Sequence, residues 1–259
     1  MKAMVLAAGL GTRLRPLTDD RPKALVTVAG RTLLEIVLRR LRAFGVSEAI
    51  VNTHHFAGTI AEYLAANHDF GMRIELSHEK VLLDTGGGLK KVAWFFLEGG
   101  DSDEPFLVHN VDVICTIDLG RMVRFHRETG ALATLAVQQR PTSRALLFDE
   151  VGRLCGRRSG PGAGNEDTNP ENLELEMVRP AKGAQALGFS GIHVLSPRIF
   201  ARMHEEGAFS IISTYLRLAA QGEKILGFFA DEYAWRDLGR LEDLAEAERE
   251  FAEGRFGVL

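Results

Sequence analysis

Short apolar runs alternate with amphipathic segments through the first 140 residues of the chain. Residues 3–8 form a continuous apolar run that Gly9 ends, which is typical of a parallel strand buried on both faces. Residues 32–44 place apolar side chains three and four positions apart, opposite three arginines, and this spacing predicts an amphipathic helix. By the same criteria we expect strands at 48–53, 72–76, 105–110 and 132–138, and helices at 59–67, 87–97 and 119–129.

This alternation predicts an α/β fold with a doubly wound, mostly parallel, Rossmann-like sheet, in which ligands bind at the carboxyl ends of the strands. The pattern changes after about residue 140. Residues 145–156 predict a hairpin, and the Gly-, Pro- and Asn-rich stretch to about residue 172 indicates a mobile loop. The remaining segments predict strands at 188–196, 225–229 and 233–238 and helices at 197–206, 211–221 and 240–253.

Composition narrows the possible partners. The 259 residues are 46% hydrophobic and 25% charged, with a net charge of −4, so no basic excess favours a nucleic-acid partner. No apolar run approaches the roughly 20 residues of a membrane span, and the first residues lack a signal-peptide pattern. Cys115 and Cys155 form no CxxC pair, so we expect structural thiols in a reducing, cytoplasmic compartment. The eight histidines lack zinc-ligand spacing, and surface or loop positions are expected for them.

The glycine-rich stretch LAAGLGTRLRPLTDDRPKAL, residues 6–25, follows the first predicted strand. Two familiar phosphate loops do not fit it. A Walker loop requires Lys and a hydroxyl residue directly after its last glycine, whereas Thr12 and Arg13 follow Gly11. A dinucleotide fingerprint requires a third glycine where Leu14 stands.

The remaining pattern, GxGTR followed by Pro22-Lys23, predicts an oligophosphate site. Gly9 and Gly11 would let the backbone approach phosphate oxygens. Arg13 offers a planar fork and Lys23 a compact charge. Two cations directed at one oligophosphate suggest a pyrophosphate leaving group at one end and an attacked α-phosphorus at the other.

This stretch resembles the signature of the sugar-1-phosphate nucleotidylyltransferases, which join an NTP to a sugar phosphate and release pyrophosphate. The resemblance continues through LLDTGGGLKK, FLVHNVDV, GFSGIHVLSP and YAWRDLG. The TGGG and FSGI blocks are most similar to the N-acetylmuramate-1-phosphate uridylyltransferase subfamily. The resemblance to the family implies one GT-A-like domain over residues 1–259. Its nucleotide-binding half would be residues 1–140, and its sugar-phosphate-binding half would be residues 141–259, with a small β-rich insertion. The resemblance also implies a monomer or small homo-oligomer.

The resemblance assigns site residues. Those at the catalytic centre are Arg13, Lys23, Asp112 and Asp237, and the two carboxylates would hold Mg²⁺. Those at the nucleotide are Leu6, Ala8, Gly9, Gly11, Thr12, Arg13, Lys23, Glu79, Gly86 and Gly87. Those at the sugar phosphate are Asn110, Arg179, Phe189, Ser190 and Gly191.

Several of these positions allow a second interpretation. An acidic residue inside an apolar strand, such as Asp237, also suits a structural salt bridge. The glycines after Asp84 also suit a helix start with no ligand. Val111 and Val178 depart from the family pattern, which has Gly and Glu at these positions.

Three functions follow from these observations. The first is Mg-dependent transfer of a nucleotidyl group, from UTP by resemblance, to a sugar 1-phosphate. The second is a guanylyltransferase that forms GDP-mannose or GDP-heptose. The third is a catalytically silent regulator that binds nucleotide sugars. The joint presence of Arg13, Lys23, Asp112 and Asp237 argues against the third.

Overall fold

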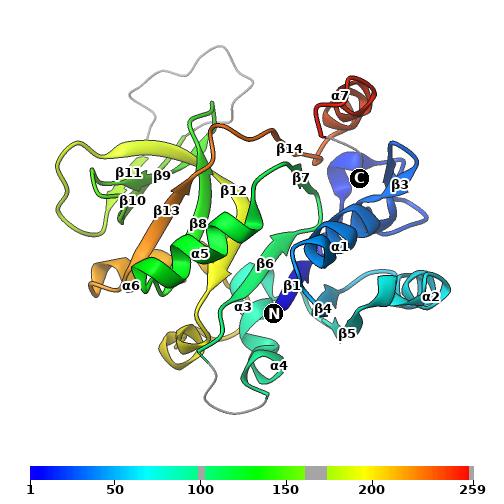
Figure 1. Cartoon of the computed structure of the whole chain (residues 1–259), viewed down its shortest axis with the longest axis horizontal. Helices are drawn as coiled ribbons and strands as arrows, with labels where there is room; N and C mark the ends of the chain where they lie inside the picture. Colours follow the sequence, from blue (N-terminus) through cyan, green and yellow to red (C-terminus); the bar gives the residue numbers. More distant parts are fainter. Residues whose placement is uncertain (99–102, 161–173, 257–259) are drawn as a thin grey trace.

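A ten-stranded mixed sheet forms the centre of the molecule in the computed structural model, which describes residues 1–98, 103–160 and 174–256 (Figure 1). Its main path runs through β11 (Glu174–Met177), β10 (Leu154–Ser159), β9 (Arg144–Phe148), β12 (Gln185–Leu195), β6 (Phe106–Asn110), β1 (Lys2–Leu6), β4 (Glu48–Thr53) and β5 (Arg73–His78). Off this path, β8 (Ala133–Gln138) pairs with β12 and β13 (Ile225–Phe229).

The central strands β6, β1, β4 and β5 all run parallel, which is the predicted doubly wound part of the fold. The long strand β12 is antiparallel to β6, β8 and β9 and joins this part to the β9–β10–β11 meander. Since β8 and β6 both oppose β12, they point the same way. Their carboxyl ends therefore meet at one end of the sheet, where ligands are expected.

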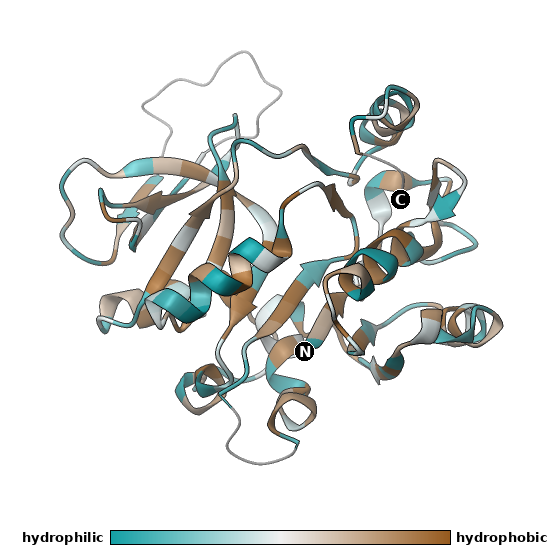
Figure 2. Ribbon diagram, viewed as in Figure 1, coloured by the Kyte–Doolittle hydropathy of each residue, from teal (hydrophilic) through white to brown (hydrophobic). Residues whose placement is uncertain are grey.

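Helices cover both faces of the sheet, and the side chains of each strand alternate between two apolar layers. On β1, Ala3 and Val5 pack into one layer with α1 (Leu33–Ala43) and α5 (Leu119–Thr129). Met4 packs into the other with α3 (Asp84–Lys91), α4 (Ala93–Leu97) and α6 (Ile211–Ala220). Hydrophobic residues accordingly follow the strands and the inner sides of the helices (Figure 2). Two helices lie farther out, α2 (Ala57–Ala66) and α7 (Leu241–Ala252).

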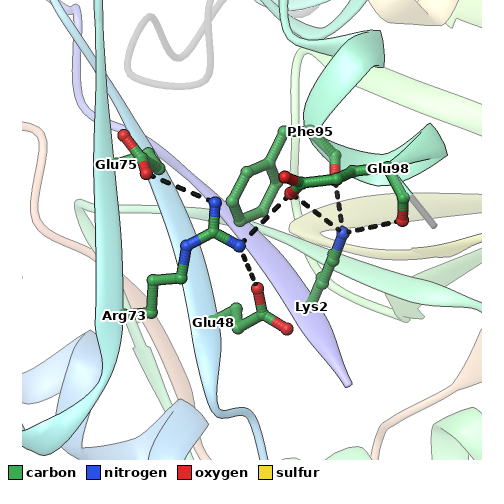
Figure 3. A network of polar contacts seen from close by, with 6 residues as sticks. All are labelled: Lys2, Glu48, Arg73, Glu75, Phe95 and Glu98. Carbon is green, nitrogen blue, oxygen red and sulfur yellow. Dashed lines mark hydrogen bonds and ion pairs between the residues drawn. The ribbon is translucent and has the colours of Figure 1, made fainter.

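A polar network fastens α4 to the amino ends of the strands, at the opposite end of the sheet from the strands' carboxyl ends (Figure 3). Lys2 donates to the carbonyl of Phe95 at 2.6 Å. Arg73 contacts Glu48 at 2.7 Å and Glu98 at 3.2 Å. The side chains of this network are partly exposed, so solvent screens each ion pair, and the network mainly fixes geometry.

Most predicted elements are present, with shifted ends. The first strand ends at Leu6 rather than at residue 8. The N–H of Ala7 donates to the Asn52 side chain at 2.7 Å instead of to a neighbouring strand, and the chain turns away. The expected helix at 87–97 is two helices, and the first begins already at Asp84. The expected helix at 197–206 is a 3-10 segment, Pro197–Arg202.

The hairpin predicted at 145–156 is formed by β9 and β10. The loop expected after it falls mostly on residues 161–173, which lie outside the described residues, while its first residues extend β10 to Ser159. The hydrophobic pattern did not reveal the short strands β2 (Thr27–Val28), β3 (Arg31–Thr32) and β7 (Val113–Cys115).

Candidate active site

Two carboxylates lie side by side beyond the carboxyl end of β6. Asp112 falls between β6 and β7, and Asp237 ends β14 (Trp235–Asp237), which pairs antiparallel with β7. In that ribbon Asp237 stands opposite Val113, and the N–H of Leu238 donates to the carbonyl of Asp112 at 2.7 Å. Residues 125 positions apart in the sequence thus become neighbours.

The charges of these carboxylates are mutually dependent. Burial raises the pKa of Asp237, and the neighbouring Asp112 carboxylate raises it further, while Lys23 and Arg13 act in the opposite direction. Lys23 is buried and donates to Asp112. The four residues predicted for the catalytic centre therefore form one electrostatic cluster.

Gly239 lets the side chains of Arg13 and Asp237 approach the same point. A Cβ atom at this position would lie 2.6 Å from Oδ1 of Asp237 and 2.7 Å from Nη2 of Arg13. Both side chains therefore occupy the space that any other residue would need. In the family-like segment WRDLG, Asp237 thus supplies a carboxylate, and Gly239 leaves space for Arg13 of the glycine-rich loop.

The glycine-rich loop leaves the sheet after β1 and folds over Lys23. Gly11 has φ +64°, a left-handed conformation that favours glycine. Its carbonyl accepts from the Thr18 hydroxyl at 2.8 Å, and a Cβ would lie 3.1 Å from that of Lys23. Gly9 has open space where a Cβ would be. A hollow of about 250 Å³ lies against this loop, lined by Gly9, Leu10, Thr12, Arg15, Thr18, Asp19, Arg21, Pro22, His55 and Phe56.

The other residues expected at the nucleotide are less accessible. Leu6 and Ala8 flank the start of the loop and are half-buried. Glu79, expected at the edge of the base, is 1% exposed, and its carboxylate accepts from Asn52 at 2.8 Å and from the N–H of Leu83 at 3.0 Å. Both carboxylate oxygens of Glu79 thus accept hydrogen bonds inside the protein. Glu79 supports the segment before α3 rather than presenting a free acceptor.

Gly86 and Gly87 are also turned inward. Their N–H groups donate to the carbonyl of Phe209 at 2.9 and 3.3 Å. A Cβ at Gly86 would come within 2.4 Å of the Phe209 ring. The glycines therefore allow a close approach between α3 and the segment before α6, which corresponds to the interpretation without a ligand.

Three of the residues expected at the sugar gather next to Asn110. Phe189, Ser190 and Gly191 lie where the pairing of β12 with β8 is irregular. Gly191 has φ +73°, and a Cβ there would lie 2.8 Å from Nδ2 of Asn110. The carbonyl of Ser190 accepts from Nε1 of Trp235 at 2.8 Å, which ties this segment to β14.

Arg179 is not part of this group. Its guanidinium pairs with Asp149 in the β9–β10 turn and donates to the carbonyl of Leu154 at 3.1 Å. The charge expected to hold the sugar phosphate is thus neutralised within the meander. Sequence reasoning missed a second arginine, Arg140, which follows β8 at the site end of the sheet; its place after a predicted buried strand was the available signal.

The histidines correct another expectation. His109, His126 and His193 are buried rather than at surface positions. His109 is 1% exposed, and its Nδ1 contacts the carbonyl of Asn110 at 2.7 Å. Val111 is also a core residue and is not among the residues with positive φ, so a β-branched side chain fits the position for which the family resemblance implied glycine. Cys115 and Cys155 are buried free thiols, as predicted.

The donor set at the strand ends suits magnesium. Within the described residues no group of three or more His, Cys, Asp or Glu side chains could hold a metal. Magnesium needs only one or two protein carboxylates, since phosphates and water complete its shell. Asp112 and Asp237 supply two. Burial and then the neighbouring Asp112 carboxylate raise the pKa of Asp237, and a divalent cation would relieve the repulsion between the two carboxylates.

Fold and site together define a nucleotidyltransferase. The family model described as "Nucleotidyl transferase" matches residues 2–148. The chain is 36% identical to the N-acetylmuramate alpha-1-phosphate uridylyltransferase of Caulobacter vibrioides over 97% of each chain. It is 37% identical to mannose-1-phosphate guanyltransferase beta-B of Xenopus laevis over 94% of this chain and 62% of that protein. The crystal structure of a UDP-glucose pyrophosphorylase complexed with UDP-glucose superposes with a TM-score of 0.73 at 18% identity, covering 98% and 99% of the two chains.

The chain therefore belongs to the nucleotidyl transferase family, and within it to the sugar-1-phosphate nucleotidylyltransferases. This confirms the resemblance and the predicted fold class. Across the residues that the structure describes, no helix has the length and apolarity to cross a membrane.

Proposed function

We propose that the protein transfers a uridylyl group from UTP to a sugar 1-phosphate, with Mg²⁺ bound by Asp112 and Asp237. The observation that carries this proposal is the cluster of two carboxylates and two cations at the carboxyl ends of the strands. A regulator that only binds nucleotide sugars would have no need for two adjacent carboxylates, one of them with a raised pKa.

In the proposed reaction an oxygen of the sugar phosphate attacks the α-phosphorus of UTP, and the bond to the β-phosphate breaks. The products are UDP-sugar and pyrophosphate, and no protein group is covalently modified. Catalysis therefore rests on positioning and on charge neutralisation. Gly9, Gly11 and Thr12 present the loop to the phosphates, and Arg13 holds the leaving pyrophosphate. Lys23 is placed to stabilise the charge that grows on the α-phosphate.

Asp112 and Asp237 would hold the metal, which would supply positive charge to the phosphates when bound. The sugar would lie against Asn110, Phe189 and Gly191. The Caulobacter relative supports uridine as the base and N-acetylmuramate α-1-phosphate as the acceptor. The Xenopus relative keeps GTP and mannose 1-phosphate as the second candidate pair.

The test is a panel of UTP, dTTP, GTP and ATP against N-acetylmuramate, glucose and mannose 1-phosphates, with released pyrophosphate measured with and without EDTA. We expect the highest rate with UTP and no release after chelation. Asp112→Asn and Asp237→Asn should each lower the rate about 100-fold or more, because each removes a metal ligand. Asp237→Asn should unfold no more readily than the wild type, since burial disfavours the ionised carboxylate.

Glu128→Gln, on the exposed face of α5, is the matched control and should retain the wild-type rate. Near-wild-type turnover in either Asp variant would remove the metal assignment. A preference for GTP would establish the guanylyltransferase alternative, and binding of nucleotide sugars without turnover would establish the regulator.

A further inference from the structure

Arg140 is held firmly at the carboxyl end of β8. The Gln138 side chain donates to the carbonyls of Ala230 and Tyr233 at 2.7 and 2.8 Å. The N–H of Gln139 donates to Asp231 at 2.6 Å. Since these contacts immediately precede Arg140, its backbone position is well defined.

The guanidinium of Arg140 lies between the expected sugar segment and the strand that carries Asp237. Its central carbon is 3.9 Å from the centre of the Trp235 ring, two residues before Asp237. Nη2 donates to the carbonyl of Phe189 at 2.7 Å. A Cβ at Gly188 would lie 2.7 Å from the same carbon, so this glycine makes room for the guanidinium.

Arg140 forms no ion pair among the described residues, and the Asp237 carboxylate acts on its charge only from beyond ion-pair distance. Within the described residues no ion pair of 4.0 Å or less reaches this half-buried side chain, and its Nε is buried without a hydrogen-bond partner. Two other enclosed cations, Lys23 and Arg179, are by contrast paired with Asp112 and Asp149. A partly desolvated cation without a paired carboxylate is unfavourable. Binding of an anion would therefore be favoured at Arg140.

We propose that Arg140 binds the phosphate of the sugar 1-phosphate, the group that attacks the nucleotide, and that Arg179 does not. This rests on the proposed function. The Phe189 segment would contact the sugar, and the Asp237 strand lies where the attacking phosphate must arrive. Arg140 touches both, so its free N–H groups are placed at the junction of sugar and phosphate. A guanidinium stacked on an aromatic ring keeps its planar fork oriented for a phosphate.

The experiment compares Arg140→Gln, Arg140→Lys and Arg179→Gln, with N-acetylmuramate α-1-phosphate and UTP as substrates. Arg144→Gln, exposed at the start of β9, is the matched control. In Arg140→Gln the KM for the sugar phosphate should rise about 10- to 100-fold, the usual loss for a hydrogen bond to a charged group. The KM for UTP should change less than about twofold, because the nucleotide phosphates lie at the other cations. The KM of Arg140→Lys for the sugar phosphate should lie between those of Arg140→Gln and the wild type. Arg179→Gln and Arg144→Gln should have the wild-type KM.

Glutamine retains a donor for the Phe189 carbonyl but lacks the charge. An unchanged KM in Arg140→Gln would show that Arg140 only braces β12, and an increase in Arg179→Gln instead would restore Arg179 as the phosphate residue. A calorimetric titration with inorganic phosphate separates this proposal from the proposed function. If no substrate pair turns over, the function fails, but weaker phosphate binding by Arg140→Gln than by the wild type still supports the site. Equal binding by both, or none by the wild type, overturns it.

Discussion

Single residues in this site carry distinct parts of the chemistry because their surroundings differ. Lys23 is 8% exposed and paired with Asp112, so its ammonium group is held in position before any ligand binds. Arg13 is exposed, and it and Asp237 both approach the space above Gly239. A fixed, buried charge suits an interaction made in the transition state, whereas an exposed fork suits the capture of a phosphate.

We therefore expect Lys23 and Arg13 variants to show different kinetics. Lys23→Met keeps the packing of the stem under Gly11 but removes the charge, so kcat should fall about 100-fold with a smaller change in the KM for UTP. Arg13→Lys should raise the KM for UTP and lower kcat together, because a point charge cannot replace the fork. Steady-state kinetics with UTP varied distinguish the two, with Arg124→Lys on the exposed side of α5 as control. A change in KM alone for Lys23→Met would contradict the assignment.

At the scale of elements, α7 connects β14, which carries Asp237, to the turn between β2 and β3. Arg236, next to Asp237 on β14, donates to both carboxylate oxygens of Glu250 at 2.6 and 2.9 Å. Glu248, on the same helix, accepts from the N–H of Ala29 in the β2–β3 turn at 2.9 Å. Hydrogen bonds from Arg236 lower the pKa of Glu250. The helix thus holds the position of Asp237 relative to the segment that follows Lys23.

Glu250→Gln should accordingly weaken both the fold and the metal site. We expect the free energy of unfolding at pH 7.5 to fall by about 1–3 kcal/mol, because Arg236 and Arg255 each lose a paired carboxylate while Arg236 keeps Glu246. The Mg²⁺ concentration for half-maximal rate should rise roughly tenfold, as for other residues that orient a metal ligand. Urea unfolding and a magnesium titration measure the two effects, and Glu253→Gln, exposed at the end of α7, is the control. Loss of stability with an unchanged magnesium requirement would show that α7 is only structural.

The same scale explains what the sequence could predict. β1, β4 and β6 are buried on both faces, so each is a visible apolar run, and Asp112 was placed because it directly follows one of them. The contact of Arg140 with Trp235 joins residues 95 positions apart in the sequence, which no local pattern reveals. Gly86 and Gly87 have the composition of a ligand loop, but Phe209, more than 100 residues later, occupies their N–H groups.

At the scale of the whole molecule, three buried histidines link stability to pH. His109 and His193 lie on neighbouring strands, and His126 contacts Thr134 at 2.9 Å between α5 and β8. Burial lowers the pKa of His109 and His126 to about 4 and that of His193 to about 3. All three are therefore neutral in the native state at neutral pH, within the two apolar layers that flank the sheet.

The sign of the resulting pH dependence follows from these depressed pKa values. Unfolded histidine binds a proton near pH 6.5, whereas the native imidazoles remain neutral down to about pH 4. The histidines therefore contribute their whole stabilisation above pH 6.5, and this contribution is lost as the pH decreases from 6.5 toward 4. Each histidine should lower the free energy of unfolding by about 2 kcal/mol when the pH decreases from 7.5 to 5.0. The raised pKa of Asp237 acts in the opposite direction, because its protonated form is favoured in the native state, so it can only reduce the loss.

Urea unfolding at pH 7.5 and 5.0 measures this dependence directly. Carboxylates with lowered pKa values, such as Glu250, lose their contribution only below the usual glutamate range, so this pH interval reports mainly on the histidines. His126→Gln retains a group that can bond to Thr134 but cannot titrate. The difference in unfolding free energy between the two pH values should shrink by about 2 kcal/mol in this variant, whatever its stability at pH 7.5. An equal difference in variant and wild type would mean that His126 is protonated in the folded protein, and that the α5–β8 contact is open to water.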